Sequence, residues 1–164
     1  NLCAAVDYGL ASGKVEEAVG AYGLAIPIFF LSTPGIHRAI ELGTRLRDRV
    51  EAKAELLAPV LLQVARAYCA LSMQATARPL GVELLALFDQ GHGLAHQTDG
   101  FILMATVEWG DTTLAEQWLL RALDEAEAGE LPDKLLTARS EVLFGTRGAL
   151  GSGLRGLGAR AVVR

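Results

Sequence analysis

Residues 107–127 read VEWGDTTLAEQWLLRALDEAE, and their pattern decides the fold. After a Gly110-Asp111 joint, apolar residues recur at the three- and four-residue spacing of an amphipathic helix. They are Leu114, Trp118, Ala122 and Leu123. Gly110 ends the preceding helix, and Asp111 is placed to cap the following one with its carboxylate. The stretch therefore predicts two helices joined by a tight turn.

The same helical spacing extends along the rest of the chain. No segment alternates cleanly with period two, and β-branched residues are sparse, so the fold class is all-α. Thr33 is expected to cap a helix that has Pro34 in its first turn. The expected helices cover 2–11, 14–32, 35–50, 54–72, 76–90, 97–109, 112–128, 134–147 and 150–162.

Sliding the chain against itself by 38 residues reveals a repeat of helix pairs. Small residues coincide at Ala39, Ala77 and Ala115, where they allow two helix backbones to approach closely. Ala126 is expected to lie at a more open helix end. Further matches are Ile26, Val64 and Ile102, then Leu31, Cys69 and Val107, and then Leu42, Leu80 and Trp118. The pattern predicts one domain, 1–164, with repeats at 14–50, 54–90, 97–128 and, in part, 134–164.

Composition agrees with a single soluble, folded domain. The chain has 164 residues, of which 51% are hydrophobic and 21% charged. Its most apolar run, Tyr22 to Leu31, is too short to cross a bilayer and contains Pro27, so no membrane partner is expected. The start at Asn1 lacks a signal-peptide pattern, and we expect a piece of a longer cytoplasmic protein. Cys3 and Cys69 are expected to be buried free thiols, with one disulfide as the alternative.

Charge is distributed unevenly along the chain. Residues 1–133 carry 9 basic and 18 acidic groups, whereas residues 134–164 carry 6 basic groups and one acid. Because the six positive charges form no tight cluster, we interpret the tail as a solvated or docking face. Binding of nucleic acid through this tail is the alternative.

Two glycine motifs resemble nucleotide-binding turns without meeting their requirements. GALGSGLRGLG, residues 148–158, contains the spacing Gly-x-Gly-x-x-Gly. It follows a helical pattern rather than a strand, and no acid comes after it. GLASGKVE, residues 9–16, has one residue too few for a P-loop and lacks the hydroxyl residue after Lys14. We therefore expect no nucleotide cofactor, and we interpret 150–162 as a glycine-rich helix packed closely on a neighbour.

Histidines and nucleophiles give no complete site either. His92 and His96 are four residues apart, with Asp99 nearby, but the glycines on both sides of His92 indicate a loop. His37 is expected to face solvent, and no metal site is expected. No nucleophile lies in a recognisable elbow, although a catalytic triad can be assembled from distant residues. Trp109 and Trp118, on either side of the Gly110-Asp111 turn, are expected to pack between helices rather than on a ligand.

The chain resembles a known family of helical repeats. Ala65, Tyr68 and Ala77 have the spacing of the small, aromatic and alanine positions of a tetratricopeptide motif, although the 38-residue period exceeds the usual 34. NLCAAVDYGLASG, residues 1–13, and the 107–127 stretch resemble the helical-repeat region of bacterial LuxR-type (MalT-like) regulators and Streptomyces antibiotic regulatory proteins. The ATP-binding and DNA-binding parts of such regulators are not visible here.

The expected architecture is therefore a short right-handed, tetratricopeptide-like solenoid of antiparallel helix pairs. Such arrays act through their surfaces, and the first helix of each pair tends to line a concave groove. The leading hypothesis is a module for protein or peptide binding, or for sensing a small-molecule effector, within a transcriptional regulator. An enzyme with an active site between helices is the runner-up, although no catalytic residue is identified. The candidate groove residues are Gln63, Arg66, Gln97 and Glu108.

Overall fold

The computed structural model describes residues 2–129, which belong to two compact units, one ending at His96 and one beginning at Gln97. The described residues form α-helices and one 3-10 turn, η1, with no strand, which confirms the all-α fold class. Within them, no helix is both long and apolar enough to cross a membrane. The helices expected at 134–147 and 150–162 lie outside the described residues, and the single domain over 1–164 stays a prediction.

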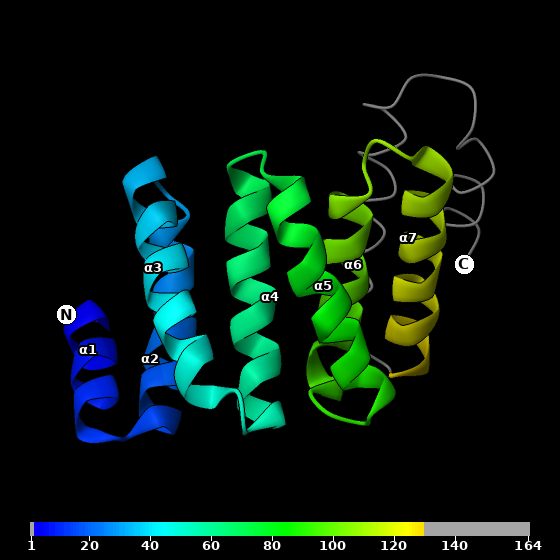
Figure 1. Ribbon diagram of the computed structural model, residues 1–164. Coiled ribbons are helices and arrows are strands. Elements are labelled where there is room, and N and C mark those ends of the chain that lie inside the picture. Colours follow the sequence, from blue (N-terminus) through cyan, green and yellow to red (C-terminus); the bar gives the residue numbers. More distant parts are fainter. Residues whose placement is uncertain (1, 130–164) are drawn as a thin grey trace. The chain divides into compact units, whose positions relative to one another are not determined.

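The α-helices of the first unit, α1 to α5, follow one another through joints of two or three residues and are coloured blue to green in Figure 1. Each packs against the next, while α2 also contacts α4 and α1 contacts α3. Such short joints bring consecutive helices back against one another as antiparallel neighbours. The elements of this unit are α1 (Leu2–Ser12), α2 (Val15–Phe29), α3 (Thr33–Val50), α4 (Ala54–Ala70), α5 (Gln74–Asp89) and η1 (Leu94–His96).

The described part of the second unit is one helix pair, α6 (Gln97–Val107) and α7 (Thr112–Ala128). The pair is held by a small apolar core of Ala105, Ala115 and Leu119. Asp111 caps α7 as predicted, because its side chain accepts a hydrogen bond from the Leu114 N–H at 3.1 Å.

The cap of α3 differs from the prediction by one residue. Ser32, in an extended conformation with φ −155° and ψ 150°, accepts the Gly35 N–H at 3.2 Å. Thr33 is already helical, so it cannot be the cap residue, and Pro34 lies within the first turn. An N-cap residue has non-helical backbone angles, and Ser32, the last residue between α2 and α3, has such angles.

Three helices of the first unit, α2, α3 and α4, meet around Tyr22. Its hydroxyl, on α2, donates a 2.8 Å hydrogen bond to the Ala39 carbonyl of α3, and both residues are buried. A methyl group added at Gly43 of α3 would overlap Val64 Cγ2 of α4 and lie 2.5 Å from the Tyr22 hydroxyl. Gly43 therefore sets how closely α3 approaches α2 and α4.

The small residues of the 38-residue repeat are buried as predicted: Ala39 and Ala77 are 0% exposed and Ala115 is 6% exposed. The period itself is not uniform, because α5 begins 38 residues before α7 but 41 residues after α3. The expectation of an open position at Ala126 is wrong. This residue is 1% exposed because the buried stripe of α7 continues into its last turn.

Candidate interaction surface

The predicted groove residues fall into two pairs that belong to different units. Gln63 and Arg66, three residues apart, lie on α4, and both are partly exposed. The rest of that helix is mostly core, with eight buried residues between Leu57 and Ala67. Gln63 and Arg66 are therefore polar positions on the one side of α4 that its neighbours leave accessible.

The other pair marks the two ends of α6. Gln97 is its first residue, whereas Glu108 lies beyond its last, in the turn that leads to α7. The prediction that Glu108 belongs to the helix is wrong, because the Glu108 carbonyl accepts the Asp111 N–H at 2.8 Å and closes the turn. Eleven residues of helical rise separate the two side chains by roughly 16 Å, so they do not form one cluster.

Glu16 lies near the start of α2, and Glu55 lies near the start of α4. Each binds the short segment just before the first helix of the following pair. Glu16 pairs with Lys53 at 3.2 Å, across 37 residues of sequence. Glu55 lies 3.0 Å from His92 Nδ1, also across 37 residues, and its second oxygen accepts the Gly93 N–H at 3.1 Å. These hydrogen bonds, that of His92 first, lower the pKa of Glu55. We call the two contacts acid clamps; sequence analysis missed them because each joins residues that are far apart along the chain.

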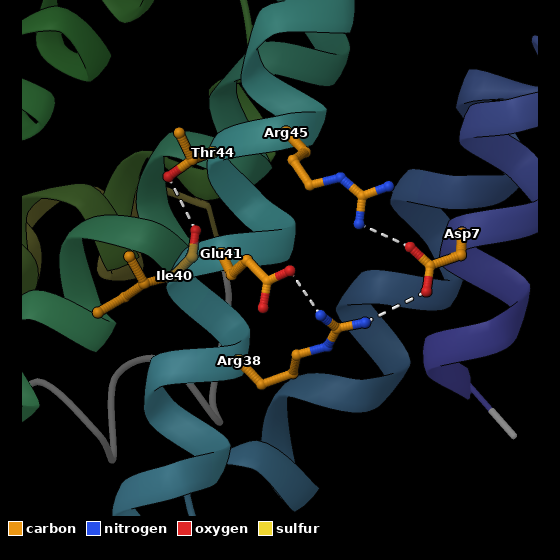
Figure 2. A network of polar contacts seen from close by, with 6 residues as sticks. All are labelled: Asp7, Arg38, Ile40, Glu41, Thr44 and Arg45. Carbon is orange, nitrogen blue, oxygen red and sulfur yellow. Dashed lines mark hydrogen bonds and ion pairs between the residues drawn. The ribbon is translucent and has the colours of Figure 1, made fainter.

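Ion pairs link α1 to α3 and α3 to α5; α3 and α5 are the second helices of the first two pairs. Figure 2 shows Asp7 of α1 between Arg45 and Arg38 of α3, at 2.7 and 3.2 Å. Arg38 also binds Glu41 at 2.6 Å, a hydrogen bond that raises the pKa of the guanidinium. On the same helix, Arg47 reaches Glu83 of α5 at 2.8 Å. Partly exposed pairs contribute little stability individually, but three of these four connect α1 to α3 and α3 to α5, while Arg38–Glu41 lies within α3.

A second surface, which sequence analysis did not single out, runs along α2 and the turn that follows it. Leu24, Ile28 and Leu31 are 71%, 59% and 82% exposed, the largest exposed apolar cluster along any one described helix. The remaining exposed residues of this stripe are Gly20, Gly23 and Pro27. None of the six is charged. The apolar run between Tyr22 and Leu31 is its sequence signal, although a run of this kind more often indicates a buried helix.

In the second unit, the two tryptophans lie in different environments. Trp118 stacks on Phe101 with ring centroids 5.9 Å apart, and the Arg121 guanidinium lies 5.0 Å from the centre of each ring. This confirms that Trp118 packs between helices. Trp109 is 45% exposed, so the same prediction is wrong for Trp109, which the turn between α6 and α7 carries into solvent.

The P-loop-like segment at residues 9–16 is a helix joint. A methyl group on Gly9 would lie 2.7 Å from Ala18 Cβ, so this glycine allows close packing of α1 on α2. Gly13 turns the chain with φ +74°. Residues 148–158, with the other glycine motif, lie outside the described residues.

Metal-ligating and thiol side chains are dispersed. No group of three potential metal ligands occurs in residues 2–129, and His92 interacts with Glu55 instead. His37 is exposed, as expected. Cys3 and Cys69 form no disulfide, as expected, but each is only partly buried. Partial burial raises the pKa of the Cys69 thiol.

Comparisons with known proteins give no relative: no family model matches the chain, and neither does any curated protein or solved structure.

Proposed function

We propose that this chain is a tetratricopeptide-like interaction module. It binds a protein, a peptide or a small-molecule effector on the side formed by α2 and α4, the first helices of the two pairs in the first unit. The observation that carries the proposal is the repetition of the acid clamp at an identical spacing of 37 residues in two successive helix pairs. A contact that recurs at the same spacing in successive pairs supports a stacked array, in which each repeat contacts its neighbours.

The ion pairs of the second helices support the same arrangement. The pair Asp7–Arg45 connects α1 to α3, and the pair Arg47–Glu83 connects α3 to α5. These charges therefore serve the packing of successive repeats. On the first helix α4, Gln63 and Arg66 lie on the accessible side and are partly exposed. We therefore place the partner site on α4, with Gln63 for hydrogen bonding and Arg66 for an acidic group.

The resemblance to LuxR-type and Streptomyces antibiotic regulators supplies the biological setting of the proposal, a cytoplasmic transcriptional regulator that senses its partner through this array. Flanking coding sequence for a P-loop ATPase and a DNA-binding helix–turn–helix would support that setting. Flanking sequence without either would count against it while leaving the interaction module untouched.

Selection of binders tests the site directly. The whole chain is used to select peptides from a random display library, and each selected peptide is titrated by fluorescence anisotropy. Arg66→Glu should weaken binding at least tenfold, whereas Arg49→Glu, an exposed arginine on α3, serves as the matched control and should have little effect. Failure to select any peptide, or equal effects of the two variants, would contradict the proposed site.

A further inference from the structure

The two acid clamps bind different basic residues. In the first, Glu16 pairs with Lys53, and in the second, Glu55 pairs with His92, each across 37 residues of sequence. A lysine side chain stays charged through the neutral pH range, whereas a histidine side chain exchanges its proton there. The same contact is therefore built once with a permanent charge and once with a charge that depends on pH.

The second clamp holds residues 90–96, the segment between α5 and α6, against α4. Glu55 uses both of its carboxylate oxygens: one lies 3.0 Å from His92 Nδ1, and the other accepts the Gly93 N–H at 3.1 Å. Gly93 is buried, and a methyl group added to it would overlap Ala58 Cβ of α4. The segment thus lies directly on α4, and the Gly93 N–H reports whether the clamp is closed.

We propose that this clamp is a pH-dependent switch, which holds residues 90–96 on α4 most firmly when His92 is protonated. A protonated imidazole adds the attraction of opposite charges to its hydrogen bond with Glu55. A neutral imidazole either donates without that charge or, in its other tautomer, turns a lone pair toward the carboxylate. The segment leads directly to Gln97, where the second unit begins, so the switch acts on the chain that connects the two units.

The carboxylate sets the acid limit of the switch. The hydrogen bond with His92, followed by that of the Gly93 N–H, lowers the pKa of Glu55. The carboxylate therefore remains ionised while a histidine gains its proton. The clamp weakens as the pH rises and His92 loses its proton. It weakens again only when the pH falls through the folded-state pKa of Glu55.

One other titratable side chain acts on the clamp. His96, in η1, lowers the same pKa of Glu55 by its charge, to a smaller extent than His92. Along the chain, the nearest other charges are Asp89, exposed at the end of α5, and Lys53, which is paired with Glu16. His96 gains its proton in the same direction of pH as His92, so the experiment has to separate the two histidines.

Exposure to solvent limits the size of the effect. The His92 side chain is 43% exposed and that of Glu55 is 68% exposed. Partly exposed pairs of this kind change a local equilibrium by about two- to fivefold. The switch therefore changes how often the segment opens, while the helices on both sides stay folded.

Hydrogen exchange of the Gly93 amide, measured by NMR on the whole chain and expressed as a protection factor, tests the switch. Between about pH 5.5 and 8, the protection factor should fall about two- to fivefold. The Ala18 amide, which donates to the Lys14 carbonyl at 3.1 Å beside the lysine clamp, is the internal control and should keep its protection. A Gly93 amide that is unprotected, or equally protected at every pH, would overturn the proposal, and so would an equal fall at Ala18.

Substitutions at the two histidines assign the effect to its source. In His92→Gln, which cannot gain a proton, and in His92→Lys, which reproduces the charge of the first clamp, the Gly93 protection factor should no longer depend on pH. His96→Gln is the matched control and should retain most of the fall. A fall that persists in both His92 variants, or that disappears in His96→Gln, would refute the assignment. Arg66→Glu should leave the pH dependence unchanged, so failure of the switch and failure of the partner site are distinguishable.

Discussion

Replacing Gly43 by alanine tests whether α3 is held against α2 and α4 by the absence of a side chain. The added methyl group would overlap Val64 Cγ2 and lie 2.5 Å from the Tyr22 hydroxyl. Neither neighbour moves aside easily. Tyr22 is 1% exposed and hydrogen-bonded to Ala39, and the branched Val64 side chain has few rotamers.

Two opposing effects determine the change in unfolding free energy. Alanine favours a helix over glycine by about 1 kcal/mol, whereas overpacking a core typically costs about 1–3 kcal/mol. Gly20→Ala on α2 is the matched control, because it gains the same helix propensity and its methyl group meets nothing within 4 Å. Gly43→Ala should therefore be less stable than Gly20→Ala by about 1–3 kcal/mol.

Urea and thermal unfolding, followed by far-UV circular dichroism at a few micromolar protein, measure this difference. In a chain of this size, about 1 kcal/mol corresponds to a shift in Tm of roughly 2–4 °C. Combining Gly43→Ala with Val64→Ala should cost less than the two changes separately, because the second removes the overlapping methyl group. If Gly43→Ala is as stable as Gly20→Ala, or if the double variant is strictly additive, the close approach described here is wrong.

Three further predictions concern the repeat, a cap and an acid clamp. Ala77→Leu should destabilise the chain by about 1–3 kcal/mol through overpacking, while Ala75→Leu, exposed on the same helix, should change thermal stability little. Asp111→Ala should cost about 1 kcal/mol, measured by urea unfolding, because it removes the cap of α7; an unchanged midpoint would contradict that role. The Glu55 carboxyl should titrate below its ordinary pKa of 4.5 in NMR, and His92→Ala should move it upward. Because its folded-state pKa is lowered, its stabilising contribution is present above the unfolded-state pKa and is lost as the pH falls through the folded-state value.

Helix positions and the joints between them could be predicted from the sequence, because both depend on neighbouring residues. Apolar spacing placed seven helices within a few residues of their observed bounds. Asp111, directly after Gly110, was identifiable as a cap because the hydrogen bond it makes reaches only three residues ahead. The cap of α3 was misplaced by one residue, since Ser32 and Thr33 both have side chains that can cap and only the backbone angles distinguish them.

Contacts between distant residues were decided by the tertiary structure alone. Nothing local to Glu55 indicates His92, and nothing local to Gly43 indicates Tyr22, because each contact depends on how whole helices stack. The exposed apolar stripe of α2, with Leu24, Ile28 and Leu31, illustrates the same limit of prediction from sequence. Its apolar composition is plain in the sequence, but the neighbours of α2 cover Tyr22 and leave Leu24 exposed, although the two residues are only two positions apart. The physical reason is that sequence spacing assigns residues to the faces of a helix, whereas only the packed neighbours determine which face stays in contact with water.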